Sequence, residues 1–132
     1  MATRKAKIDR KDWRNLPLDE WNVLTIHAYF ADMNLELYGV EPYVPMRNWA
    51  VERGMIRNAL DTYGAYVLRE AFDECFRNYR PTREYPLLTA GFAISYRINA
   101  LIPAILANRQ RRDAREQMRE ESPSWDDVRA WL

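Results

Sequence analysis

Apolar side chains recur every three or four positions along most of the chain, which is the spacing of helices that bury one face. No stretch alternates as a half-buried strand does. We therefore expect an all-α fold: a compact bundle of four to five helices, with a charged helical extension and a short Trp-rich C-terminal helix. The pattern predicts core helices from about Pro17 to Leu37, Asn48 to Tyr63, Ala65 to Tyr79 and Thr89 to Ala107.

Glycine, proline and capping residues mark the expected helix boundaries. Gly39 and Gly64 suit the left-handed position that follows a last helical turn, while Asn48 and Thr89 are good N-caps. Pro103 removes one backbone hydrogen bond from the last core helix, so we expect a kink or break there. The resulting boundaries are 1–14 for a basic mobile arm, 15–107 for the helical core, and 108–132 for the charged extension and the C-terminal docking helix.

The helical stripes also predict which large side chains form the core. Cys75 lies inside a stripe and is interpreted as a small core residue. His27 stands among apolar neighbours and is likewise interpreted as structural. A base–nucleophile pair of His27 with Cys75 is conceivable, but nothing in the sequence places the two together. The side chains expected to be mostly buried are Trp49, Ile56, Phe72, Phe76, Phe92 and Ile102.

Composition fits one soluble domain and excludes several classes of site. The chain has 132 residues, of which 48% are apolar and 30% charged, with a formal net charge of +1. Its one cysteine excludes an internal disulfide framework, and its one histidine excludes the usual multi-histidine metal sites. No phosphate-binding glycine loop or paired-carboxylate metal motif occurs. We expect no enzyme activity, no catalytic residues, no metal and no cofactor.

The sequence shows neither a targeting segment nor a clear membrane span. Its first residues lack the apolar run of a signal peptide. The longest mostly apolar stretch, residues 90–107, is interrupted by polar residues and Pro103, whereas a membrane helix needs about 20 predominantly apolar residues. We expect a cytoplasmic protein without membrane contact, with Cys75 reduced.

Charge is distributed in blocks, and one basic block interleaves cations with aromatic rings. Residues 75–112 carry seven arginines and one acid. Arginines neutralise phosphates, and aromatic rings stack on unpaired bases. The alternative is that these charges serve solubility and the rings pack in the core. A helix-turn-helix is not predicted, because the helix after Gly64 is rich in acids. The candidate nucleic-acid residues are Arg77, Arg80, Arg83, Tyr85, Arg97, Arg109, Arg111 and Arg112.

The C-terminal segment carries a second candidate interface. Four apolar side chains lie on one side of a short expected helix after Ser124. Such a helix is too short to be stable alone, so we expect it to dock on its own core, a partner protein or a second copy, with an intermolecular contact favoured. Asp126 and Asp127 would then seek a basic rim, such as residues 75–112 of a second copy. The candidate partner-binding residues are Trp125, Val128, Trp131 and Leu132.

Three segments carry a resemblance to a known group of proteins. They are Asn48-Trp49-x-x-Glu52-x-x-x-Ile56-x-x-Ala59-Leu60-x-x-Tyr63-Gly64, Phe72-x-x-x-Phe76-x-Asn78-Tyr79 and Tyr85-Pro86-x-Leu88-x-x-Gly91-Phe92-x-Ile94-Ser95-Tyr96-Arg97. Over residues 45–102 the chain resembles small helical proteins of bacteriophages and mobile elements of Gram-positive bacteria, some of them parts of replication initiators or helicase loaders. The resemblance implies a phage or prophage origin. Residues 1–132 hold no winged-helix domain, so we expect an accessory or regulatory role.

Two functions remain open at this point. The first is a non-catalytic phage-type accessory protein that binds nucleic acid, a replication complex, or both. The second is a phage-encoded inhibitor that binds a host protein, for example a polymerase or a CRISPR nuclease, without enzymatic activity. The arginine–aromatic segment favours the first, whereas the small size and the tryptophans of the C-terminal segment favour the second. A homo-oligomer formed through the C-terminal segment is compatible with both.

Overall fold

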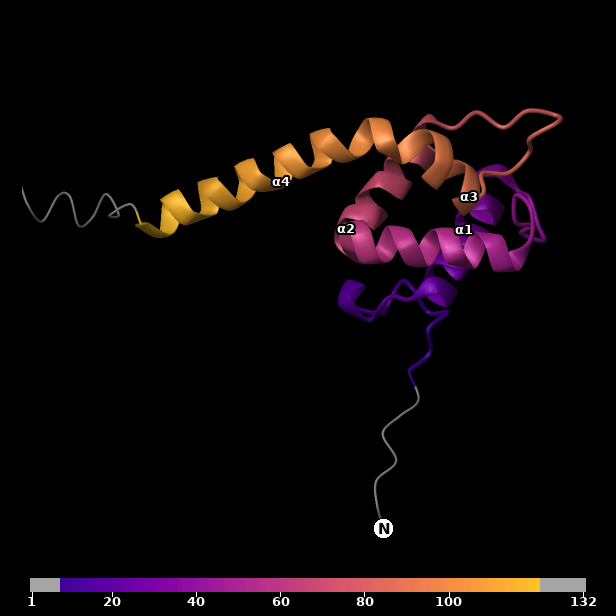
Figure 1. The fold of residues 1–132 in the computed structure, drawn as a ribbon, viewed down its shortest axis with the longest axis horizontal. Helices are drawn as coiled ribbons and strands as arrows, with labels where there is room; N and C mark the ends of the chain where they lie inside the picture. The colour runs from indigo at the N-terminus through magenta and orange to yellow at the C-terminus, as the bar shows by residue number, and fades with distance from the viewer. Residues whose placement is uncertain (1–7, 122–132) are drawn as a thin grey trace, which may run out of the picture.

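The computed structural model describes residues 8–121, which are helical and contain no strand. Helices α1 and α2 pack with the first turns of α4 into one body, from which the rest of α4 projects (Figure 1). The all-α prediction is confirmed for these residues, but a bundle of four to five helices is not, because only α1, α2 and α4 exceed five residues among them. The elements are η1 (Leu18–Glu20), α1 (Val23–Tyr38), α2 (Trp49–Asn78), α3 (Ala90–Phe92), η2 (Ala93–Arg97) and α4 (Ile98–Glu121).

Helix α1 begins later than the sequence pattern predicted. Asn22 is its N-cap: the side chain of Asn22 accepts from the backbone of Thr25, whose hydroxyl accepts from the backbone of Asn22. This reciprocal pair satisfies two backbone donors of the first turn. Pro17 instead precedes the single turn η1. The helix ends as expected at Gly39, which is left-handed with φ 68°.

Helix α2 consists of two segments that meet at a corner. Gly64 at the corner has φ 81° and ψ 160°, a backbone conformation that other L-residues rarely adopt. The two segments, residues 49–63 and 65–78, are the second and third helices that the sequence predicted. Because of the corner, the first segment faces α1 and α4, while the second packs its aromatic residues beneath α1.

An aromatic cluster joins α1 to the second segment of α2. Tyr29, Phe30 and Phe72 are completely buried. The ring of Phe30 lies 4.8 Å from that of Phe72 and 5.1 Å from that of Phe76, between centroids. The first of these contacts is edge-to-face and the second is tilted, and aromatic pairs add about 0.5–1.5 kcal/mol each beyond the burial of apolar area. This cluster is the centre of the hydrophobic core.

The core prediction is correct for four of the six side chains named from the sequence. Ile56, Phe72, Phe76 and Ile102 are at most 5% exposed. Phe92 is only partly buried. Trp49 was predicted wrongly: 46% of it is exposed, because the first turn of α2 stands at the edge of the fold and presents this side chain to a surface groove.

Residues 9–14 belong to the folded unit, although the sequence pattern placed them in a mobile arm. Trp13 is 4% exposed, and its indole Nε1 donates to Asp32 Oδ2 at 2.7 Å. Its ring meets Trp21 edge-on at 6.3 Å. The prediction failed because a single tryptophan among charged residues shows no helical periodicity. Residues 1–7 of the expected arm lie outside the described residues.

Asn34 ties the segment before α3 to α1. Its side chain both donates to the carbonyl of Leu88 and accepts from the N–H of Leu88, each at 2.8 Å. It also donates to the carbonyl of Phe30 at 2.8 Å, and it is completely buried. The amide thus supplies the backbone partners that Leu88 lacks outside a helix. This anchor fixes where the loop after α2 returns to the core.

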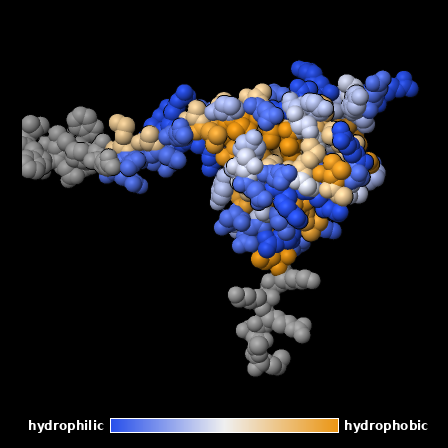
Figure 2. Space-filling view, in the orientation of Figure 1, coloured by the Kyte–Doolittle hydropathy of each residue, from blue (hydrophilic) through white to orange (hydrophobic). Residues whose placement is uncertain are grey.

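Helix α4 continues past Pro103 without the expected break. The carbonyl of Asn99 loses its donor to the proline, but both residues are exposed, so that carbonyl is open to solvent. The irregularity comes earlier, in the π-helical turn η2, where the N–H of Ile98 bonds to the carbonyl of Ala93. Hydrophobic residues gather where α4 meets the rest of the fold (Figure 2), whereas residues 110–120 are exposed.

One helical stretch, Ala90–Glu120, contains an apolar part long enough to cross a membrane, by length and composition alone. One third of that part, 33%, is buried inside the fold. Core helices of soluble proteins meet the same criterion, so a single stretch of this kind is weak evidence for a span.

Candidate nucleic-acid interface

A groove of about 750 Å³ runs between the loop after α2 and the turns that precede α4. Arg80 and Tyr85 reach it from the loop, and Tyr96 and Arg97 reach it from η2. Tyr85 is 68% exposed and Tyr96 is 67% exposed, so most of each side chain is open to solvent. The acid among the lining residues is Glu84. We call this feature the arginine–tyrosine groove.

The loop that carries Tyr85 is held in place by Tyr79. The hydroxyl of Tyr79 donates to the carbonyls of Tyr85, at 2.6 Å, and Leu87, at 3.1 Å. Thr82 and Tyr85 close a turn: the backbone of Thr82 donates to the carbonyl of Tyr85, and the backbone of Tyr85 donates to the hydroxyl of Thr82. Burial raises the pKa of Tyr79, against a smaller opposing effect of Arg97, so the hydroxyl stays protonated and keeps donating.

A row of aromatic rings forms one wall of the groove. Ring centroids lie 6.4 Å apart from Tyr79 to Phe92 and 5.3 Å apart from Phe92 to Tyr96. The guanidinium carbon of Arg97 lies 5.3 Å from the centroid of Phe92, a cation–π contact. Within residues 8–121 neither Arg80 nor Arg97 forms an ion pair. Both cations therefore remain available to an anionic ligand.

The other arginines near the loop do not line this groove. Arg77 is exposed on the last turn of α2 and pairs with Glu74 at 2.8 Å. Arg83 is exposed at the loop tip. Of the eight residues predicted from the sequence to bind nucleic acid, the groove brings together three, namely Arg80, Tyr85 and Arg97.

The arginines of α4 form a separate cluster. Arg109 and Arg112 both face Glu70 of α2, at 3.6 Å and 3.4 Å. Arg111 is exposed and donates to the side chain of Asn108 at 3.2 Å. Arg109 and Arg112 therefore help to hold α4 against α2 through their ion pairs with Glu70.

The second interface predicted from the sequence is not seen here. Its partner-binding residues, Trp125, Val128, Trp131 and Leu132, lie outside the described residues.

A buried carboxylate, Glu52, gathers polar groups from several elements. It is 1% exposed; Tyr43 donates a hydroxyl hydrogen bond to Oε1, and the N–H of Met46 donates to Oε2 at 3.1 Å. Nε2 of His27 lies 3.3 Å from Oε1. Burial alone would raise the pKa of Glu52, but the groups of His27, Tyr43 and Met46 together lower it below its ordinary value. Because Tyr43 also accepts from the N–H of Ala90 at 2.9 Å, the cluster links α1, α2 and α3.

His27 and Cys75 are not brought together. His27 packs edge-on against Trp49 at 4.9 Å and lies beside Glu52, whereas Cys75 lines a different, small cavity of about 180 Å³. Burial raises the pKa of the Cys75 thiol to about 11, so it is protonated at neutral pH. Among residues 8–121, no group of three or more His, Cys, Asp or Glu side chains could hold a metal ion.

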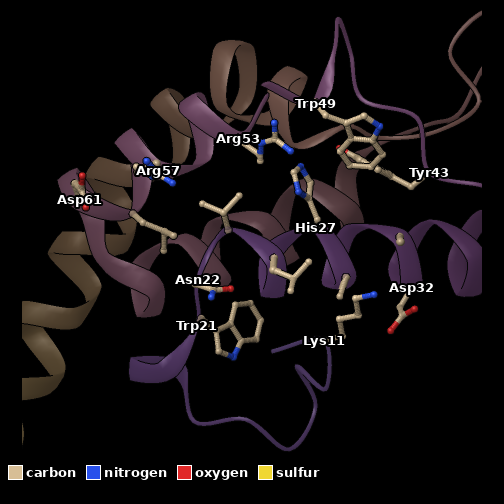
Figure 3. A pocket seen from close by; sticks show the side chains of 15 residues that line it. Lys11, Trp21, Asn22, His27, Asp32, Tyr43, Trp49, Arg53, Arg57 and Asp61 are labelled. Atoms are coloured by element: carbon tan, nitrogen blue, oxygen red, sulfur yellow. The ribbon is translucent and has the colours of Figure 1, made fainter. Parts of the chain in front are cut away.

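A larger groove, of about 1070 Å³, lies between α1 and the first segment of α2 (Figure 3). Sequence reasoning missed it, because Trp49 was assigned to the core. A signal was present: Trp49, Arg53 and Arg57 follow one another at four-residue intervals and so share one face of the helix. The spacing predicts a shared helix face, but it does not predict that α1 forms the opposite wall of a groove.

No family model, curated protein or solved structure matches the chain. The resemblance to small phage proteins therefore stays a prediction. Arguments about function rest on the two grooves and their chemistry.

Proposed function

We propose that this protein is a non-catalytic accessory protein that binds single-stranded nucleic acid in the arginine–tyrosine groove. The observation that carries the proposal is the meeting, in one groove, of two unpaired cations and two exposed rings from separate segments: Arg80, Tyr85, Tyr96 and Arg97. Cations along a groove neutralise the phosphate backbone, and exposed rings stack on bases.

The chemistry of the groove favours a single strand over a duplex. Bases in a duplex already stack on their neighbours, so Tyr85 and Tyr96 gain stacking partners only from unpaired bases. The side chains of Tyr85 and Tyr96 are each about two-thirds exposed. A nucleic-acid base offers a flat surface that can cover such a ring. The surrounding stretch, residues 75–112, adds a basic field because it carries seven arginines and one acid. Binding of this kind tolerates many sequences, which suits an accessory role in replication.

Replacing both groove arginines tests the electrostatic part. The double variant Arg80→Ala/Arg97→Ala is expected to bind a fluorescein-labelled oligo(dT) more weakly and to flatten the slope of log K against log salt by about 1–2 units. Fluorescence anisotropy over a salt series measures both quantities. The matched control is Arg115→Ala/Arg119→Ala on the exposed part of α4, which removes the same charge and should leave most of the slope in place. Equal losses in both double variants would contradict the groove as the binding site.

Replacing the two tyrosines tests the stacking part. Tyr85→Ala and Tyr96→Ala should each weaken oligo(dT) binding by about 1–3 kcal/mol, with the salt slope unchanged, because no phosphate contact is removed. Tyr66→Ala is the control, since Tyr66 is 51% exposed but lies on α2 away from the groove. Unchanged affinity in both groove variants would rule out base stacking there.

Oligonucleotide binding by the intact chain also decides between the two functions derived from the sequence. If it binds no oligonucleotide at low salt, the proposal is wrong, and the alternative, an inhibitor of a host protein, takes its place. That alternative rests on the tryptophans of the C-terminal segment, Trp125 and Trp131.

A further inference from the structure

The groove between α1 and α2 has an apolar floor that its own chain leaves uncovered. Leu24, Ala28 and Ala31 follow α1 at intervals of four and three residues, and all three line the groove. Leu24 is 47% exposed and Trp49, on the opposite wall, is 46% exposed. We call this feature the α1/α2 groove. Its stripe has the spacing with which one helix packs against another.

The charged residues that line the groove are the cations Lys11, Arg53 and Arg57 and the acids Asp32 and Asp61. Arg53 and Arg57 lie one turn apart on α2, and within the described residues neither forms an ion pair. His27 points toward Trp49 and Arg53 (Figure 3). Its Nε2 is buried and makes no hydrogen bond of good geometry in this part of the chain, although Glu52 lies beside it. An occupant that is apolar on one side and acidic on the other fits this arrangement.

The groove opens on the side of α2 that faces away from α4. Met55 and Ala59 of α2 line a cavity together with Ile98 of α4. At 100° per residue, these positions lie on the face of α2 opposite to Arg53 and Arg57. Helix α4 thus starts behind the helix whose front forms the groove.

We propose that the α1/α2 groove receives residues 124–132 from a second copy of this chain. That segment places Trp125, Val128 and Trp131 three residues apart, the spacing of one helical face, to cover the apolar floor. On a helix, Asp127 lies at the edge of this apolar face, where it meets the unpaired arginines at the rim, whereas Asp126 lies on the opposite side. The sequence suggested residues 75–112 as the basic rim; the structure offers Arg53 and Arg57 beside an apolar floor instead.

The course of α4 favours a second copy over the same chain. Ile105 is the last buried residue of α4, and Glu121 lies about 24 Å further along the axis at 1.5 Å per residue. Figure 1 shows this part of α4 leaving the fold. Docked as a helix, residues 124–132 would span only about 13 Å, less than the distance of about 24 Å that they would have to cover to return along α4 to the fold. Two copies that exchange these segments satisfy both grooves with one two-fold axis.

The apolar floor also means that the α1/α2 groove suits a different kind of ligand from the arginine–tyrosine groove. A nucleic acid has little apolar surface with which to cover Leu24, Ala28 and Ala31, whereas a tryptophan-bearing helix covers them. The two proposals therefore rest on different residues and can fail independently.

Light scattering after size-exclusion chromatography, without nucleic acid, tests the proposal on the full chain and three variants. The first variant lacks residues 123–132, the second is Leu24→Glu/Arg57→Glu, and the control is Leu37→Glu, an exposed leucine of α1 outside the groove. We expect a dimer for the full chain and the control. The other two variants should be monomers at the same concentration, with the dissociation constant raised about 100-fold or more.

The decisive measurement is the mass of a mixture of the shortened chain and the groove variant. The shortened chain keeps its groove and the groove variant keeps its segment, so a 1:1 mixture should form a heterodimer although each component alone is monomeric. Thermal melting monitors the folding of each variant. If the groove variant unfolds, Arg53→Glu/Arg57→Glu replaces it, and dimerisation should return when Asp127→Arg is added to the same chain.

Four results would overturn the proposal. They are a full chain that stays monomeric, a groove variant that remains dimeric, a mixture of the two variants that does not assemble, and a groove variant of unchanged mass that has lost oligo(dT) binding. The last result would make nucleic acid the occupant.

Discussion

Phe72→Ala is expected to lower the free energy of unfolding by about 3–5 kcal/mol. Phe72 is completely buried and lies edge-on to Phe30 at 4.8 Å, in the cluster that joins α1 to α2. Truncation removes the ring's apolar surface and leaves a cavity that the neighbouring helices can close only in part. Urea denaturation followed by circular dichroism measures the loss.

The matched control for this substitution is Leu37→Ala. Leu37 is 53% exposed, so its removal should change the free energy of unfolding by about 0.5 kcal/mol or less. An unchanged midpoint for Phe72→Ala would mean that the second segment of α2 does not present this face to α1.

Glu52→Ala is the second substitution with a large expected effect, about 3 kcal/mol of destabilisation. It removes the acceptor of two part-buried hydrogen bonds, those from the hydroxyl of Tyr43 and the N–H of Met46, and a hydrogen bond to a charged group contributes about 1.5–3 kcal/mol. Chemical denaturation at neutral pH measures the loss. Glu116→Ala, an exposed glutamate of α4, should be nearly neutral under the same conditions.

The same carboxylate predicts a pH dependence. Because folding lowers the pKa of Glu52 below 4.5, the ionised group stabilises the fold fully above pH 4.5, and this contribution disappears as the pH falls through the lowered pKa. The stability difference between the natural chain and Glu52→Gln should therefore shrink on acidification. A difference that stays constant or grows as the pH falls would show that the carboxylate is not held ionised.

Helix positions were largely available from the sequence because each core helix repeats its apolar residues over several turns. Gly39 and Gly64 both have the positive φ that their residue type suggested, and Asn48 and Thr89 accept the N-cap hydrogen bonds expected of them. These features depend on local chemistry, which a short window of sequence contains.

Contacts between distant segments were not available in the same way. Trp13 is buried because Asp32 and Trp21 receive it, and neither partner is near it in any local pattern. Trp49 kept perfect helical spacing yet stands half exposed, since periodicity identifies a face of a helix but not whether another element covers it.

For the candidate site too, the sequence showed what depends on local pattern and not what depends on contacts between distant segments. Arg80 and Tyr85 were found because they lie close together in a basic and aromatic stretch. Arg97 was found as part of the same block, but its meeting with Tyr85 across the groove depends on the anchor that Asn34 provides for Leu88. Arg109 and Arg112 share the composition of the block, and only the structure shows Glu70 beside them.

The corner at Gly64 has a consequence for how this sequence can evolve. A side chain at position 64 would meet no neighbouring atom, yet the backbone there, with φ 81°, excludes nearly every residue except glycine. A residue that took the helical conformation at this position would instead make residues 49–78 one straight rod. The rod would carry Phe72 and Phe76 away from α1 and split the aromatic cluster. Position 64 therefore has room for a side chain, as a variable surface position does, but its backbone geometry restricts it to glycine.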